Sequence, residues 1–187
     1  MAGRFPLLEK VYLESPVVDK GGYPYFVNPI SDGIPKVDPA LLEEVVAGLC
    51  DLCSGDIDLI LAPEAMGIHL ATGVSLRTRI PFAVMRKRKY GLPGEIEVVT
   101  KTGYSESKMY INGVRKGDRV AIIDDVVSTG GTLLALSKGL HSIGAEVVVT
   151  AVVYNKSEDL EEVRRRTGLN IRTMLDIGVR DGRPVIL

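Results

Sequence analysis

The chain of 187 residues has little cysteine, no tryptophan and no marked excess of charge of either sign. Its two cysteines, Cys50 and Cys53, lie three residues apart with no second Cys or His cluster, so we interpret them as packing residues on one helical face and not as a zinc site. The formal net charge is −1, which argues against a protein that depends on non-specific contact with nucleic acid.

Long apolar runs are also missing. No stretch of about 18 uncharged apolar residues occurs, so we expect no membrane span. The first ten residues lack the apolar core of a signal peptide, and we expect a cytoplasmic protein. The phosphate-binding patterns Gly-x-x-x-x-Gly-Lys-Ser/Thr and strand-linked Gly-x-Gly-x-x-Gly are absent, which excludes two common nucleotide-binding classes.

What is present is an alternation of apolar runs and amphipathic stretches, which predicts one α/β domain over residues 1–187 with a doubly wound parallel sheet. We expect strands at 57–62, 82–85, 119–123, 146–153 and 172–176, and helices at 39–52, 65–76, 131–143 and 157–167. Residues 1–36, with a short helix and an aromatic, proline-punctuated run, predict a hood-like lobe at the sheet edge. Residues 88–105 are polar and rich in glycine, which predicts a mobile flap with hairpin character.

The most informative run is 119–133, where a β-branched strand leads into Asp124 and Asp125, a glycine-rich loop and a helix. Ionised carboxylates only accept hydrogen bonds, so the pair suits the vicinal diol of a ribose. A phosphate fits the loop at the start of the helix, where backbone N–H groups and hydroxyls converge. The residues that we expect to bind it are Ser128, Thr129, Gly130, Gly131 and Thr132.

This run closely resembles the phosphoribosyl diphosphate (PRPP) motif of type I phosphoribosyltransferases: a hydrophobic strand, two acids, two hydrophobic residues and a Thr-Gly-Gly-Thr loop. The resemblance covers most of residues 20–157, is specific at 119–133, and is nearest to the archaeal hypoxanthine/guanine enzymes. It implies the parallel doubly wound sheet of that family, with a small N-terminal hood and a flexible flap. It also implies a homodimer whose substrates are PRPP and a purine base, with no nucleic-acid or membrane partner.

A second anion site is expected after the strand at 57–62, where Ala65 and Met66 offer backbone N–H groups to diphosphate. The adenine branch of the family has Glu-Ala-Arg-Gly here, and Met66 replaces the arginine; a plain strand-to-helix turn is the alternative. We also expect Arg86, Lys87 and Lys89 to contact diphosphate, within one subunit or across a dimer, although a solvated charge run would have the same sequence.

For the base we expect contacts from Lys156, after the strand at 146–153, and from Asn28 in the hood. A lysine only donates, so it suits the 6-oxo group of hypoxanthine, guanine or xanthine and opposes the amino group of adenine. Both positions resemble base contacts of bacterial xanthine phosphoribosyltransferases. The alternatives are a surface lysine before a helix and a turn residue before a proline.

The resemblance implies displacement of diphosphate from C1 of PRPP by a purine nitrogen, through an oxocarbenium-like state beside Asp124 and Asp125. Mg²⁺ is the expected cofactor, held mainly by PRPP and not by a protein metal site. Many hypoxanthine-guanine enzymes have an Asp where this chain has Ser128, and that Asp handles a purine proton. Glu95 and Glu106 in or beside the flap are our candidates for this task.

The sequence therefore predicts a purine salvage enzyme that converts hypoxanthine, and guanine, into IMP and GMP. Adenine or xanthine specificity is the alternative among purine enzymes, and a pyrimidine-linked enzyme remains open. The alternative from another class is a PRPP-sensing regulator of the same fold, for which a chain of this length and charge leaves little room.

Overall fold

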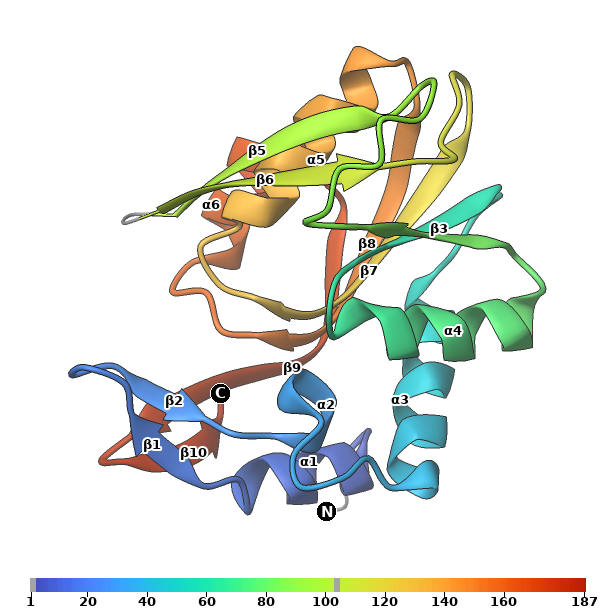
Figure 1. Cartoon of the computed structure of the whole chain (residues 1–187). Helices are drawn as coiled ribbons and strands as arrows, with labels where there is room; N and C mark the ends of the chain where they lie inside the picture. The colour runs from blue at the N-terminus through green and yellow to red at the C-terminus, as the bar shows by residue number, and fades with distance from the viewer. Residues whose placement is uncertain (1–2, 103–104) are drawn as a thin grey trace.

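The computed structural model describes the backbone of residues 3–102 and 105–187, and the side chains of residues 3–99 and 107–187. Its centre is a six-stranded sheet in the order β10-β9-β8-β7-β3-β4 (Figure 1). The strands are β3 (Leu59–Pro63), β4 (Phe82–Met85), β7 (Arg119–Val127), β8 (Glu146–Asn155), β9 (Ile171–Arg180) and β10 (Arg183–Ile186). Neighbours from β4 to β9 pair in parallel, whereas β10 is antiparallel to β9, so the sheet is mixed. The predicted α/β class is confirmed; the antiparallel edge strand was not predicted.

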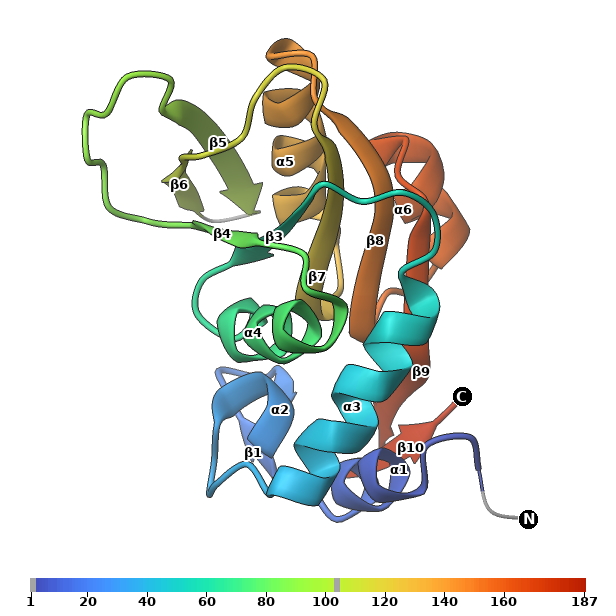
Figure 2. The ribbon, with the colours of Figure 1, turned by 90° about the vertical axis from the view of Figure 1, so that its right-hand side faces the viewer.

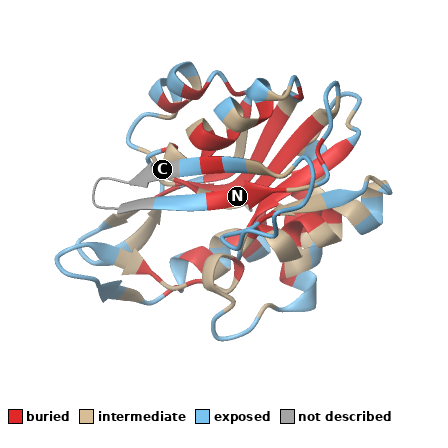
Figure 3. Cartoon of the chain, turned by 45° about the horizontal axis from the view of Figure 1, so that its top comes forward, coloured by how far each residue is buried: buried red, intermediate tan, exposed pale blue. Residues whose placement is uncertain are grey.

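Alternate residues of each strand face different layers of the molecule. In β3, Ile60 and Ala62 pack in one core with α3 (Pro39–Leu52) and α4 (Gly67–Thr78). Leu59 and Leu61 pack in a second core with α5 (Gly131–Ser142) and α6 (Leu160–Thr167). Figure 2 shows the sheet between these helices, and Figure 3 shows that its central strands are largely buried. Covered on both faces, the central strands β3, β7 and β8 have the nearly continuous apolar runs that the sequence indicated.

The hood consists of α1 (Pro6–Leu13), β1 (Val17–Asp19), β2 (Pro24–Phe26) and α2 (Pro29–Asp32), and it lies at the bottom of Figure 1. We expected one short helix here, and the structure has two helices and an antiparallel β1–β2 ribbon. The rings of Tyr12 and Phe26 lie 5.3 Å apart, and both contact Tyr154 of β8, with centroids 5.5 and 5.9 Å away. This aromatic cluster attaches the hood to the carboxyl-terminal half of β8.

The expected flap contains an antiparallel hairpin, β5 (Ile96–Thr102) and β6 (Ser105–Ile111), which extends beyond the predicted limit at residue 105. Val98 of β5 is buried against α5, so the base of the hairpin belongs to the second core. Residues 103 and 104 of the predicted flap lie outside the described residues. The mobility of the flap stays a prediction.

Element boundaries differ from the expectation at two places that matter for the site. Strand β7 continues to Val127, so Asp124 still pairs with Val152 of β8 instead of lying beyond the strand. Helix α6 begins at Leu160 and not at residue 157, because the side chain of Asp159 caps it. No helix in the described part of the chain is both long and apolar enough to cross a membrane.

Candidate active site

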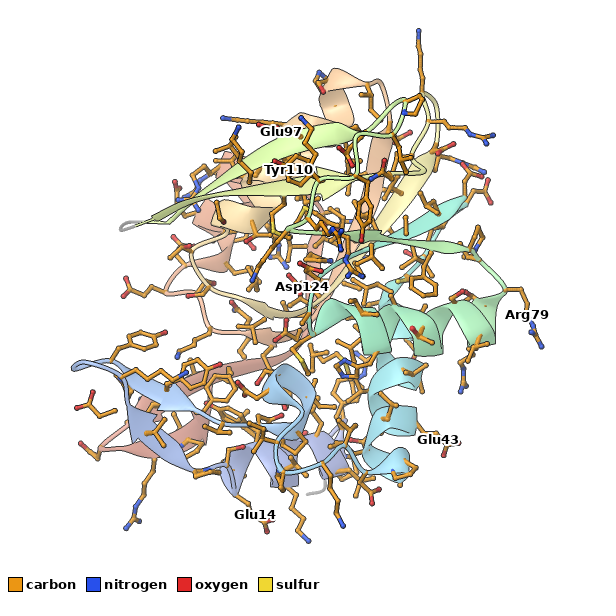
Figure 4. The ribbon with its side chains drawn as sticks, in the orientation of Figure 1. Glu14, Glu43, Arg79, Glu97, Tyr110 and Asp124 are labelled. Atoms are coloured by element: carbon orange, nitrogen blue, oxygen red, sulfur yellow. The ribbon has the colours of Figure 1, made fainter. Side chains whose placement is uncertain are left out.

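The acid pair lies near the carboxyl end of β7, in the middle of the molecule, between the hairpin and the hood (Figure 4). Adjacent strand residues point to opposite faces, so the two carboxylates meet different surroundings. Asp124 lines the pocket of the glycine-rich loop. Burial raises the pKa of Asp125, with a contribution from the carboxylate of Asp32 in the hood. The pair therefore connects the loop pocket with the hood.

Both acids hold their protons more tightly than a free aspartate. Burial raises the pKa of Asp124 well above its ordinary value, and the charge of Asp125 adds to this effect. The backbone N–H of Asp125 donates to Oδ1 of Asp124 over 3.0 Å. A bound cation, or a reacting centre that becomes positive, would favour the ionised forms of both carboxyl groups. The site is thus arranged to respond to positive charge.

The glycine-rich loop encloses a pocket of about 140 Å³, lined by Asp124 and residues 126–133. All five residues expected to bind phosphate line it: Ser128, Thr129, Gly130, Gly131 and Thr132. Gly130 has φ of 71°, in the left-handed region that favours glycine. A Cβ there would lie 2.5 Å from Cγ1 of Val163 on α6, so the close approach of α6 also requires glycine.

Two helices begin at this edge of the sheet without a capping side chain. Helices α2, α3 and α6 are capped by Asn28, Asp38 and Asp159, and Glu44 accepts from the N–H groups of Leu7 and Leu8 at the start of α1. Helices α4 and α5 begin at Met66 and Gly130 with no side-chain cap. They follow β3 and β7, which are parallel neighbours, so their N-termini share one edge of the sheet. The N–H of Ile68 in α4 donates to the carbonyl oxygen of Ala65 over 3.2 Å. The other first-turn N–H groups, which no side chain caps, and the helix dipole make both ends suited to anions.

The loop between β3 and α4 holds the expected diphosphate residues. Ala65 is exposed and Met66 is half-buried, with its Cε 3.8 Å from the position that a Cβ on Gly33 of the hood would take. The peptide bond between Glu64 and Ala65 is cis. A Cβ at Gly67 would lie 2.9 Å from the carbonyl oxygen of Ile123, so α4 starts directly against β7. The two uncapped helix ends are therefore adjacent.

The basic segment after β4 is fastened to this loop. Oε2 of Glu64 accepts Nε of Arg86 over 2.8 Å, and its Oε1 accepts the backbone N–H of Lys87 over 2.8 Å. Nζ of Lys89 lies 4.0 Å from Oε2 of Glu97 on the hairpin. The structure thus brings Arg86 and Lys87 to the β3–α4 loop and directs Lys89 to the hairpin. Glu64, which sequence reasoning passed over, is the residue that joins the two segments.

The two expected base contacts have different surroundings. Lys156 follows β8, and its Nζ lies 3.4 Å from the carbonyl oxygen of Pro24 and 4.3 Å from the ring of Tyr23. It lines a pocket of about 550 Å³, called the larger pocket below, together with Tyr23, Ser128 and Thr129. Asn28 is fully buried: its amide donates to Ser15 and accepts from Ile30 and Tyr154. The side chain of Asn28 is therefore used to hold the hood and does not face this pocket.

Of the two candidates for proton transfer, Glu95 is bound to its own loop. The carboxylate of Glu95 accepts from Nδ2 of Asn112 and from the backbone N–H groups of Tyr90 and Gly91, at 2.9 to 3.0 Å. These contacts, chiefly that with Asn112, lower its pKa, which favours an ionised carboxylate that orders the loop before β5. The side chain of Glu106 lies outside the described residues.

Arg166 on α6 is a second residue that the sequence did not reveal. Its guanidinium donates to the carbonyl oxygen of Thr129 in the glycine-rich loop. The two residues are 37 positions apart, and no local pattern connects them. Only the packing of α6 on the loop brings them together.

Comparison with known proteins identifies the family. The phosphoribosyl transferase domain matches residues 40–174. The chain belongs to this family. Among phosphoribosyl transferases, it is 51% identical over 176 residues to the hypoxanthine/guanine phosphoribosyltransferase of Methanothermobacter thermautotrophicus, covering 94% of this chain and 91% of that protein. It is 53% identical over 169 residues to "HGPRTase-like protein 2" of Haloterrigena turkmenica, covering 90% and 92%.

Solved structures show the same fold at lower sequence identity. The adenine phosphoribosyltransferase of Thermoanaerobacter pseudethanolicus has a TM-score of 0.74 and 24% identity, covering 90% of this chain and 99% of that chain. That of Saccharomyces cerevisiae has a TM-score of 0.73 and 19% identity, covering 90% and 98%. The fold expected from the resemblance, that of a type I phosphoribosyltransferase, is thereby confirmed.

Proposed function

We propose that the protein transfers the 5-phosphoribosyl group of PRPP to hypoxanthine, and to guanine, and releases diphosphate with IMP or GMP. One observation carries this proposal: two uncapped helix N-termini lie at neighbouring strand ends with the acid pair beside them. PRPP has a phosphate at one end, a diphosphate at the other and a vicinal diol between. The arrangement of the site matches that order of groups.

The choice of an oxopurine is supported by two independent facts. Several relatives that are about half identical over most of the chain are named hypoxanthine/guanine phosphoribosyltransferases. Lys156 places a hydrogen-bond donor beside Tyr23 in the larger pocket. A donor pairs with a 6-oxo group, whereas adenine would leave a donor unpaired at a cost of about 1–3 kcal/mol. We therefore assign the base contact to Lys156, and to Asn28 the task of holding the hood.

In the proposed reaction the free N–H groups of α5 bind the 5′-phosphate, and those of α4 bind the diphosphate with Arg86 and Lys87 nearby. The acid pair accepts the ribose hydroxyls and stabilises positive charge at C1. In the described part of the chain, no cluster of three or more His, Cys, Asp and Glu side chains is arranged for a metal ion. A Mg²⁺ ion fits the acid pair when PRPP supplies most of its ligands, and it would neutralise charge on the leaving diphosphate.

A turnover assay with radiolabelled bases tests the proposal. Hypoxanthine, guanine, xanthine and adenine are each offered with PRPP and Mg²⁺, and we expect the largest kcat/KM for hypoxanthine or guanine and no turnover after chelation of the metal. A clear preference for adenine or xanthine would refute the proposed specificity and support the alternative one. Absence of turnover with all four bases, combined with measurable PRPP binding, would support a regulatory protein of this fold.

A further inference from the structure

The last turn of α6 carries three arginines with different partners. Arg164 pairs with Glu161 and Arg165 with Glu162, each three residues earlier on the helix. Arg166 forms no ion pair within the described side chains, and its guanidinium donates to the carbonyl oxygen of Thr129. Its Nη2 also lies 3.2 Å from the position that a Cβ on Gly130 would take. One arginine of the three is therefore directed at the phosphate loop.

The contact with Arg166 affects the orientation of one peptide unit, that between Thr129 and Gly130. The Thr129–Gly130 bond is trans, so its C=O and N–H groups point in opposite directions. Arg166 lines the larger pocket and is not part of the lining of the loop pocket. A carbonyl that Arg166 holds on the side of the larger pocket directs the N–H of Gly130 to the side of the loop pocket, where the phosphate is expected.

The loop backbone does not fix this orientation by itself. Gly130 has φ of 71° and is followed by Gly131, and glycine reaches left- and right-handed conformations at similar energy. A flip of the Thr129–Gly130 peptide would direct a carbonyl dipole at the phosphate instead of an N–H. A charge-assisted hydrogen bond to Thr129 opposes that flip and also polarises the N–H at the other end of the unit.

We propose that Arg166 is a positioning residue for PRPP: by holding the carbonyl of Thr129 it aims the N–H of Gly130 at the 5′-phosphate. The inference rests on the proposed function, because it assumes that the loop binds this phosphate. It adds a residue from outside the loop, so α6 becomes part of the substrate-binding apparatus.

The test compares R166Q and R166K with R165Q, a matched control on the same turn whose arginine is paired with Glu162. We measure the Kd of ribose 5-phosphate by calorimetry, and KM for PRPP and for the base. For R166Q we expect the Kd and the KM for PRPP to rise about tenfold, a factor that equals about 1.4 kcal/mol. The melting temperature should stay near wild type, and the Kd of ribose 5-phosphate, which contains no base, separates this effect from any change at the base pocket. R166K should recover part of the loss, and R165Q should behave as wild type.

A second measurement reports directly on the orientation of the Thr129–Gly130 peptide. The backbone amide resonance of Gly130 in the ligand-free protein should shift in R166Q and not in R165Q. An unchanged resonance together with unchanged ribose 5-phosphate affinity in R166Q would overturn the inference while leaving the proposed function intact. Failure of the wild-type protein to bind ribose 5-phosphate would instead refute the proposed function.

Discussion

Asp124 and Asp125 show that the contacts and the pKa of an aspartate depend on its surroundings. The two are identical in type and adjacent in sequence, yet Asp124 lines the loop pocket and the charge of Asp32 in the hood bears on Asp125. Both are held in a region where burial favours the neutral carboxylic acid. Such a pair is unfavourable for the empty protein and favourable for a bound cation, as expected of a site that stabilises positive charge.

The first prediction concerns Asp124→Asn. Because burial raises the pKa of Asp124 in the folded protein, the folded state binds its proton more tightly than the unfolded chain does. The stability that this proton contributes is present below the unfolded pKa and is lost as pH rises through the folded pKa. We expect Asp124→Asn to melt at a higher temperature than wild type near pH 7, with a smaller difference near pH 4. Turnover should fall about 100-fold or more.

Thermal melts of both proteins across this pH range check the prediction. Asp124→Asn removes the titrating group at constant size, so groups that do not interact with Asp124 cancel in the comparison, and the difference reports the pair that it forms with Asp125. A difference in melting temperature that does not depend on pH would show that Asp124 has no perturbed proton equilibrium.

The second prediction is that Lys156→Gln raises KM for hypoxanthine about tenfold, equivalent to about 1.4 kcal/mol, and changes KM for PRPP much less. The reason is that the ammonium group lies beside Tyr23, in the larger pocket, and not in the loop pocket. Lys138→Gln, an exposed lysine on α5, is the control. Steady-state kinetics with each substrate varied in turn decide the matter, and an equal change in both KM values would argue against a base contact.

At the scale of elements, the site depends on which helices begin without a capping side chain. Capped helices satisfy some of their first N–H groups with side chains, whereas α4 and α5 have no side-chain cap. Helix α5 has a second task, since the hairpin β5–β6 packs on it: a Cβ at Gly139 would lie 2.3 Å from Cγ1 of Val98. The helix that is expected to bind the phosphate therefore also carries the base of the flap.

The third prediction follows from this contact. Gly139→Ala should destabilise the protein by about 1–3 kcal/mol through overpacking, although Gly-to-Ala changes inside helices normally stabilise by about 1 kcal/mol. Val98→Ala in the same chain should remove the clash and recover much of the loss. Urea unfolding of the two single variants and the double variant measures the coupling; additive effects would show that the hairpin does not rest on α5 in solution.

At the scale of the whole molecule, the hood and the sheet share a buried network. The hydroxyl of Tyr154 on β8 donates to Oδ1 of Asn28 over 3.1 Å, and Tyr12 donates to the carbonyl oxygen of Gly178 over 2.7 Å. These bonds, together with the aromatic cluster, place Tyr23 above the end of β8, where it meets Lys156. The position of the hood thus decides the shape of the expected base pocket.

The fourth prediction is that Tyr154→Phe lowers the free energy of unfolding by about 0.5–1.5 kcal/mol, because the buried Oδ1 of Asn28 loses one of its two donors and keeps the N–H of Ile30, while the ring remains in place. Tyr90→Phe, at an exposed position before the hairpin, is the control and should have little effect. Equilibrium denaturation in urea measures both. Equal stability of the two variants would show that the hydrogen bond contributes nothing to holding the hood. The predicted homodimer and cytoplasmic location stay predictions at this scale.

The fold followed from local signals to a large extent. The helix at 39–52 and the strand at 82–85 were placed at their observed bounds, because a cap with a following proline and a short apolar run are strong local signals. The ribbon β1–β2, the edge strand β10 and the start of α6 were missed. Short strands depend on their partners more than on their own residues, and Asp159, which caps α6, lies inside the helix expected at 157–167.

For the site, the sequence by itself determined that the acid pair leads into the glycine-rich loop whose residues line one pocket with Asp124, since both are contiguous segments whose chemistry does not depend on distant residues. The tertiary structure alone decided that Asn28 is buried in the hood, that Glu95 orders its own loop, that Glu64 joins two segments and that Arg166 reaches Thr129. Each of these depends on contacts between residues far apart in the chain or on the hydrogen bonds that a side chain has already formed. Such contacts arise when elements pack, and no spacing in the sequence encodes them.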